Sequence, residues 1–283
     1  MRRTLFIWLL ALLLTGSAVR ANEPASARIQ GLAGSGVALC DDPAVVYWNP
    51  AGIFYQNRIG LDATFFFETE ALDVVPPQNW GISYVNYSPS IRRGSGFGIY
   101  RKVDSAVPEG GNATAVVLAT VYPTPLGIPM GLSLKYIQEK WAAEGRKHYF
   151  TADAGVVLPW EKLRVGFCLQ SLPRVNSRLF PHRILFGAYW KMTDFIGFAA
   201  QVSLDEWSDF NALDEAQRSI GAEIKPLKWL WVRGGWINNP FADSWCLGIS
   251  FQDNKAHTQL HLTYRRNPDA TEHNLFISYT YTI

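Results

Sequence analysis

The sequence predicts an all-β fold, an antiparallel transmembrane β-barrel of about 14 strands with an N-terminal hatch, or plug, segment in the lumen. Three observations favour this fold. From about residue 58 onward, apolar residues alternate with small or polar ones, which is the period of strands with two unlike faces. Aromatic residues make up 14% of the chain and charged residues only 18%. After the N-terminal apolar run, no segment reaches the roughly 18 apolar residues of a membrane-spanning helix.

The chain begins with the pattern of a secretory signal peptide, which we assign to residues 1–21. Arg2 and Arg3 precede the apolar run Leu5–Leu14, which at about ten residues is too short to span a bilayer. Small residues favour cleavage after Ala21; the alternative is an uncleaved anchor. Cleavage would take Lys and Arg from 26 to 23 against 24 Asp and Glu. This near-neutral balance gives nucleic acid no electrostatic basis for binding.

Residues 22–57 form the predicted hatch. Its first part, Gly31–Gly36, is small and apolar, and such residues allow close packing against a surrounding wall. Asp41-Asp42-Pro43 favours a turn or a helix start over an acid pair or a cation site. The segment ends in Asn49-Pro50-Ala51-Gly52, where the proline fixes φ and the glycine allows a chain reversal.

Residues 58–283 form the predicted wall. One face of its segments is apolar, and the other is rich in Gly, Ala, Ser and Cys with scattered charges, which suits a narrow, filled lumen. The alternative is a secreted, soluble β protein. We expect strands near residues 58–73, 79–88, 94–105, 113–123, 129–141, 147–158, 163–170, 183–192, 195–205, 217–225, 229–237, 244–253, 256–266 and 273–283, with a short helical loop at 206–216.

Two further sets of wall residues follow from this interpretation. Aromatic residues near strand ends predict interfacial girdles, and charged residues on the small-residue face are expected to point into the lumen. The girdle residues are Trp80, Tyr100, Tyr122, Trp141, Trp160, Trp190, Trp229, Trp231 and Trp236. The lumen charges are Asp62, Lys135, Asp153, Arg164, Lys191, Glu223, Lys225 and Arg233.

The last segment alternates up to the final residue of the chain. Leu275, Ile277, Tyr279, Tyr281 and Ile283 fall on one face, a pattern similar to the signal that the barrel-assembly machinery reads on bacterial outer-membrane proteins. The usual last residue is aromatic, and here it is isoleucine. We therefore expect this machinery as a partner during biogenesis and outer-membrane lipid as the surroundings of the wall.

The hatch motif resembles the N-terminal signature of the FadL-like outer-membrane proteins, and most closely that of their PorV/PorQ branch. The resemblance covers residues 31–53 and is carried by Gly34, Gly36, Asp41, Asp42, Pro43, Tyr47, Trp48, Asn49, Pro50, Ala51 and Gly52. It implies a barrel in the bacterial outer membrane, with Asn49, Pro50 and Ala51 in a hatch inside it. It also implies passage of hydrophobic, fatty-acid-like small molecules. The alternative is an accessory barrel of a protein secretion system with a structural or cargo-handling role and a secretion-system subunit as partner.

The resemblance further implies that ligand leaves sideways through a gap in the wall. Gly94, Gly96, Gly98 and Pro108 flank the third segment, where kinks or bulges would weaken strand pairing. Tight packing of these glycines against the hatch is the other interpretation.

The sequence predicts no enzyme, no catalytic residue, no cofactor and no metal site. The five histidines are scattered without metal-ligand spacing, and the glycine-rich run lacks the features of a nucleotide-binding loop. His261 with Ser250 or Ser278 is conceivable as a hydrolytic pair, but no spacing supports it. Cys40, Cys168 and Cys246 are expected to be structural thiols, and one disulfide among them stays open.

Overall fold

The computed structural model describes residues 25–56, 59–70, 73–74, 79–104, 111–142, 145–177, 179–205, 216–238, 243–253, 255, 257–266 and 272–283. The predicted signal peptide, Pro108 and nearly all of the predicted helical loop lie outside these residues. The predicted boundary between hatch and wall falls on residues 57 and 58, which also lie outside them.

The wall is one closed antiparallel sheet in which each strand pairs with its neighbours along the chain. The last strand, β15, pairs with β1 over eleven residues, from Gly60 opposite Thr282 to Glu70 opposite Glu272, and closes the barrel. Fourteen strands make the barrel, and the two-residue β2 only extends the end of β1, so the predicted fold is confirmed. The strands are β1 (Ile59–Glu70), β2 (Asp73–Val74), β3 (Asn79–Ser88), β4 (Arg93–Asp104), β5 (Gly111–Pro123), β6 (Pro129–Trp141), β7 (Gly145–Trp160), β8 (Leu163–Leu172), β9 (Arg183–Lys191), β10 (Ile196–Asp205), β11 (Gln217–Leu227), β12 (Leu230–Asn238), β13 (Ser244–Gln252), β14 (Thr258–Arg266) and β15 (Glu272–Thr282).

The two ends of the barrel differ in their connections. At one end, which we call the short-turn end, the chain turns over a few residues, as at 89–92, 161–162 and 228–229. Both the start of β1 and the end of the chain lie there, because the amide of Ile283 donates to the carbonyl of Ile59 at 2.9 Å. The opposite, long-loop end carries the longer connections, such as 71–78 and 173–182. Among the described residues, no helix has the length and hydrophobicity needed to cross a membrane.

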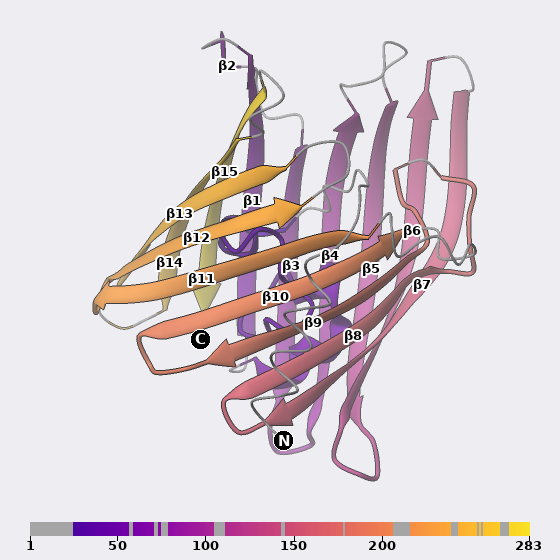
Figure 1. Ribbon diagram of the computed structural model, residues 1–283. Helices are drawn as coiled ribbons and strands as arrows, with labels where there is room; N and C mark the ends of the chain where they lie inside the picture. Colours follow the sequence, from indigo (N-terminus) through magenta and orange to yellow (C-terminus); the bar gives the residue numbers. More distant parts are fainter. Residues whose placement is uncertain are drawn as a thin grey trace.

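The wall is higher on one side than on the other. β7 has 16 residues and β8 only 10, so β7 pairs with β6 from Gly145 onward but with β8 only from Ala152 onward. Figure 1 shows β3 to β7 standing upright and β8 to β13 crossing the barrel at a strong tilt. The long-loop end is therefore uneven.

The two faces of the wall are as unlike as the alternation predicts. Leu134 and Phe150 on the outer face are 67% and 74% exposed, whereas Lys135 and Asp153 on the inner face are each 1% exposed. Of the other predicted lumen charges, Asp62, Glu223 and Arg233 are buried as well. Lys191 is exposed at the short-turn end, so the prediction that it points into the lumen is wrong.

The predicted girdles need a second correction. Tyr100 and Trp141 are buried in the lumen, at 0% and 3% exposure, because the period of two places them on the inner faces of β4 and β6. Closeness to a strand end does not decide which face a side chain takes. Tyr122, Trp160 and Trp229 are exposed at 45%, 46% and 45%, consistent with a girdle position.

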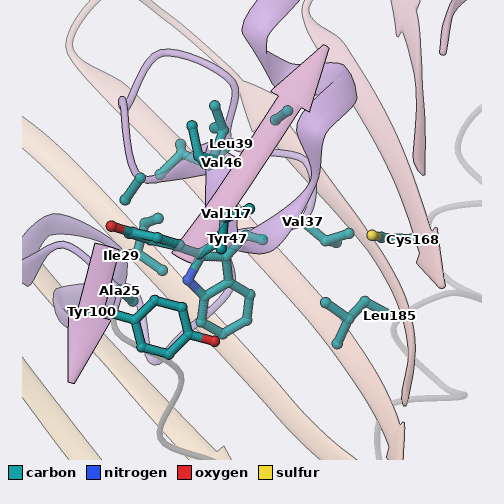
Figure 2. Packing of buried hydrophobic residues seen from close by; sticks show 14 of the residues in the cluster. Ala25, Ile29, Val37, Leu39, Val46, Tyr47, Tyr100, Val117, Cys168 and Leu185 are labelled. Carbon is teal, nitrogen blue, oxygen red and sulfur yellow. The ribbon is translucent and has the colours of Figure 1, made fainter. Parts of the chain in front are cut away.

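The hydrophobic core lies inside the barrel. One large cluster combines residues of the N-terminal segment with small and apolar residues of the inner wall. Figure 2 shows part of it, with Val37, Val46 and Tyr47 of the N-terminal segment and Val117, Cys168 and Leu185 of the wall. The lumen is thus a packed interior at this level.

Candidate functional site

The candidate site is the hatch, residues 25–56, together with the wall residues that it contacts. The hatch contains α2 (Ala27–Gly31), α3 (Val45–Trp48) and the 3₁₀ helix η1 (Pro50–Tyr55). α2 contacts β12 to β15 and η1 contacts β3 to β7, so the hatch crosses the lumen from one side to the other (Figure 1). Of residues 25–53, all of which are described, only Asp41 is exposed.

The turn that the two adjacent aspartates predict is present, and the two carboxylates have different partners. Asp42 accepts from the amide of Ala44 at 2.9 Å, which makes the turn, and from the Ser26 hydroxyl at 2.5 Å. Asp41 forms an ion pair with Arg28 at 3.2 Å. Burial raises the pKa of the Asp42 carboxyl. The aspartates therefore hold the hatch in shape and do not act as a pair.

Asn49 anchors the hatch to the seam between β7 and β8. Its side-chain amide group donates to the carbonyls of Val37, Val156 and Phe167 at 2.9, 3.1 and 3.4 Å. Val156 and Phe167 are directly opposite each other across the seam. The side-chain oxygen of Asn49, Oδ1, accepts from the amide of Ala51 at 3.1 Å and caps η1, whose first residue is proline. One side chain thus fixes both the hatch fold and its docking.

Tyr47 makes an equivalent contact with the seam between β3 and β4. Its hydroxyl lies 2.5 Å from the carbonyl of Ile82 and 3.2 Å from that of Ile99, which face each other across β3 and β4. The ring lies against Gly98, where a Cβ would overlap it. From the wall, Gln170 on β8 donates to the Tyr47 carbonyl at 2.9 Å. Hydrogen bonds to already paired carbonyls use the second lone pair of each oxygen and leave the sheet intact.

The wall carries glycine at many of its closest approaches to the hatch. A Cβ at Gly131 would overlap the backbone of Ala51, and one at Gly155 would overlap the side chain of Asn49. No other residue fits such positions without moving the hatch. A Cβ would also come within 3.0 Å of a hatch atom at Gly60, Gly94, Gly96, Gly98, Gly166, Gly187, Gly221 and Gly235.

The three glycines of the predicted sideways opening belong to this set. Gly94, Gly96 and Gly98 face Ile53, Val46 and Tyr47 of the hatch. β4 pairs with β3 and with β5 in unbroken register along this stretch. The described residues therefore fit the tight-packing interpretation, and an opening here stays a prediction that requires hatch residues to withdraw.

A buried cluster of charges joins α2 to the wall on the other side. Arg28 and Arg233 each form an ion pair with Glu223 at 2.9 Å, and the Tyr189 hydroxyl donates to the same carboxylate at 2.8 Å. Burial alone would lower the pKa of Arg28, but Asp41 and Glu223 outweigh it and raise that pKa above its ordinary value. Removing one partner of such a buried cluster costs roughly 3–5 kcal/mol, because an uncompensated charge stays behind.

The Ser250 and His261 pair lies beside this cluster. Their side chains are 2.6 Å apart on adjacent strands, and Arg233 donates to the serine hydroxyl. Serine and histidine are 0% and 1% exposed. Their polar atoms are thus engaged within the packed interior, away from any described surface.

The connection between β8 and β9 closes the lumen at the long-loop end. Leu179 and Phe180 are 2% and 1% exposed, and Lys102 on β4 donates to the Leu179 carbonyl at 3.1 Å. The Phe180 ring lies 5.6 Å from that of Tyr100, which lies 5.0 Å from that of Tyr47. Three rings therefore link this segment to the hatch.

Sequence reasoning did not find the inward position of this connection. The wall is irregular where it begins, because β8 carries an extra residue opposite β7 and Ser171 has φ 60°. Asp153 accepts from the Ser171 amide at 3.0 Å and so provides a hydrogen-bond partner for the backbone at the bulge. The same carboxylate pairs with Lys135 at 2.8 Å. The prolines at 173 and 181, which bound the break between two alternating segments, were the available signal.

The remaining predicted site residues are the three cysteines and the outward residues of the C-terminal strand. Cys40, Cys168 and Cys246 are buried free thiols, and the described residues contain no group of three metal-ligating side chains. In the C-terminal strand, Leu275, Tyr279 and Ile283 are exposed on the outer face at 36%, 50% and 51%. Whether the assembly machinery reads them stays a prediction.

Comparisons with known proteins agree with the fold. No family model and no curated protein matches the sequence. The CymD monoaromatic hydrocarbon channel is similar in structure, with a TM-score of 0.70 and 14% identity over 92% of this chain and 98% of that chain. A Pseudomonas aeruginosa FadL homologue has a TM-score of 0.66 and 10% identity over 95% of this chain and 100% of that chain. The P. putida toluene transporter TodX has a TM-score of 0.61 and 12% identity over 92% of this chain and 99% of that chain. Likeness at such identities establishes the shared barrel fold, and the finer PorV/PorQ assignment stays a prediction.

Proposed function

We propose that this chain is a bacterial outer-membrane channel through which hydrophobic small molecules pass when the hatch moves. One observation carries the proposal: residues 25–56 fill the lumen and are anchored to the wall by Asn49, Tyr47 and Arg28. In this proposal, cargo passes through the filled barrel only after those bonds break. The similar solved structures, which are described as hydrocarbon channels and a toluene transporter, support the same class of cargo.

The proposed orientation follows from the two ends of the barrel. In bacterial outer-membrane barrels, the short turns face the periplasm and the longer loops face the outside. The short-turn end would then face inward and the segment with Phe180 would cover the outer entrance. We further propose that the chain is exported with a cleaved signal, residues 1–21, and inserted by the barrel-assembly machinery.

The proposed ligands are apolar molecules, fatty-acid-like or monoaromatic. Phe180, Tyr100 and Tyr47 offer ring surfaces from the entrance to the hatch, and aromatic rings favour flat or flexible apolar partners. Ligand entering from outside would displace Phe180 first and meet the hatch second.

A reversible cross-link of the hatch tests the proposal. The hydroxyls of Ser35 in the hatch and Ser219 on β11 lie 2.9 Å apart, which brings two cysteines there within disulfide range. Cells that lack the chain and are complemented with the Ser35→Cys/Ser219→Cys variant should take up labelled toluene and oleate only after reduction. The Ser35→Cys single variant is the control.

Two results would count against the proposal. If the oxidised, fully cross-linked double variant takes up cargo as fast as it does after its disulfide is reduced, the hatch need not move. Equal uptake by cells without the chain would remove the transport function. If the transport function is removed in this way, copurification of a large stoichiometric partner with the chain from its native membrane would favour the secretion-accessory alternative.

A further inference from the structure

The outer face of β4 to β7 changes from apolar to basic over one step along the strands. Strand register aligns the outward residues of these strands and of β3 in rows across the wall. Two neighbouring rows contain only aliphatic or aromatic side chains: Tyr84, Phe97, Leu118, Leu134 and Ala152, then Ile82, Ile99, Val116, Tyr136 and Phe150. The next two rows toward the long-loop end contain Trp80, Arg101, Thr114, Gln138 and His148, then Val103, Asn112, Lys140 and Arg146.

The three cations of these rows, Arg101, Lys140 and Arg146, form what we call the basic patch. All three are exposed. Lys140 and Arg146 are directly opposite each other on β6 and β7, an arrangement in which like charges destabilise the sheet. The two polar rows contain no carboxylate, and no described residue forms an ion pair with any of the three cations. An anion between the three cations would offset this repulsion through charge-assisted hydrogen bonds.

We propose that the basic patch binds the phosphate of an anionic lipid in the outer leaflet, with its acyl chains along the apolar rows below. This inference rests on the proposed membrane orientation, and it does not depend on what the channel carries. Arg and Lys are the side chains that bind phosphate groups by charge-assisted hydrogen bonds. A lipid fits better than a soluble anion because Tyr136 and Phe150, 36% and 74% exposed, lie one row further into the apolar band.

The basic patch lies in one sector of the barrel, on the outer face of β4, β6 and β7. Elsewhere on the wall, Arg266 at the long-loop end of β14 is an exposed outward cation. Its cross-strand neighbours are Trp245 on β13 and His273 on β15. Arg266 therefore provides a control for removal of an exposed outward cation at the same end of the barrel. We expect it to bind lipid phosphate far less well than the three-cation patch.

The test measures lipid retention by the purified full-length barrel in neutral detergent. Native mass spectrometry would compare a diphosphorylated lipid A with phosphatidylcholine on wild type, the Arg101→Gln/Lys140→Gln/Arg146→Gln variant and the Arg266→Gln control. At roughly 1 kcal/mol per cation near an anionic surface, loss of three should weaken lipid A binding on the order of a hundredfold. The control should bind like wild type, and added salt should weaken wild-type binding.

Several outcomes separate the explanations. Equal lipid A binding by the triple variant and wild type would overturn the proposal, and so would a wild type without preference for the phosphorylated lipid. Displacement of lipid A by millimolar inorganic phosphate would show a free-phosphate site in its place. Heat-modifiable migration checks that each variant is folded. Since no transport is measured, a channel that fails in uptake but retains lipid A refutes only the proposed function.

Discussion

Asn49→Asp is the sharpest test of the hatch anchor. The substitution conserves volume, and the remaining oxygen can still accept from the Ala51 amide that it caps. It removes both N–H groups that now serve the carbonyls of Val37, Val156 and Phe167. In their place it brings a carboxylate oxygen toward carbonyl oxygens, which repel it. The hatch should keep its own fold and lose its hold on the β7–β8 seam.

The size of the effect follows from the number of donors. An amide has two N–H groups, so the three carbonyls share two hydrogen bonds. At a net value of about 0.5–1.5 kcal/mol each, their loss costs about 1–3 kcal/mol before repulsion is counted. Since 1.4 kcal/mol is a factor of ten in an equilibrium, the open fraction of the hatch should rise about 5-fold to 150-fold.

Single-channel conductance in planar bilayers measures this open fraction directly, and toluene uptake measures its consequence. Asn86→Asp makes the same chemical change at an exposed position on the outer face of β3 and should behave as wild type. If Asn49→Asp gives the open fraction and uptake of the Asn86→Asp control, the anchoring argument is refuted.

Three further predictions concern other parts of the site. Gly155→Ala should lower the yield of folded, heat-modifiable barrel severalfold because its Cβ overlaps the anchoring asparagine, whereas Gly234→Ala, with its nearest atom 3.9 Å away, should fold normally; equal yields would contradict the close-contact argument. The pKa of the half-exposed Asp41 carboxyl is lowered, because partial removal from water would raise it but the ion pair with Arg28 outweighs that effect. The ion pair therefore stabilises the closed hatch above the ordinary carboxyl pKa of about 4 and is lost as pH falls through the lowered value, so conductance should rise in acid for wild type and be flat over that range for Asp41→Asn. Phe180→Ala removes roughly 3–5 kcal/mol of packing at the entrance and should speed toluene uptake severalfold; a rate at or below that of wild type would show that this ring does not restrict entry.

The barrel could be predicted from the sequence because its two faces meet different surroundings. Lipid outside and a packed hatch inside impose a strict alternation, as in β6 between Met130 and Trp141. Strand ends were less accurate, since β7 begins at Gly145 and runs for 16 residues while the expected segment began at 147. Strand ends depend on connections, which alternation does not describe.

The contacts of the hatch could be predicted only in part. Asn49 and the turn at Asp42 were found because they belong to a local motif. The pairing of Arg28 with Glu223 joins residues 195 positions apart, and the approach of Phe180 to Tyr100 depends on an inward loop. Such contacts follow from barrel closure, which brings distant strands to a common interior and leaves no trace in local periodicity.

The glycines that face the hatch also make the wall dependent on it. Glycine weakens a strand, since it has no side chain to pack and more backbone entropy to lose. Without the hatch, the sheet would have bare inner patches at Gly131, Gly155 and Gly221, and little to define its curvature. The hatch precedes β1 in the chain, and the pairing of β1 with β15 is the step that closes the ring. At these glycine positions the hatch supplies the packing that wall side chains supply elsewhere.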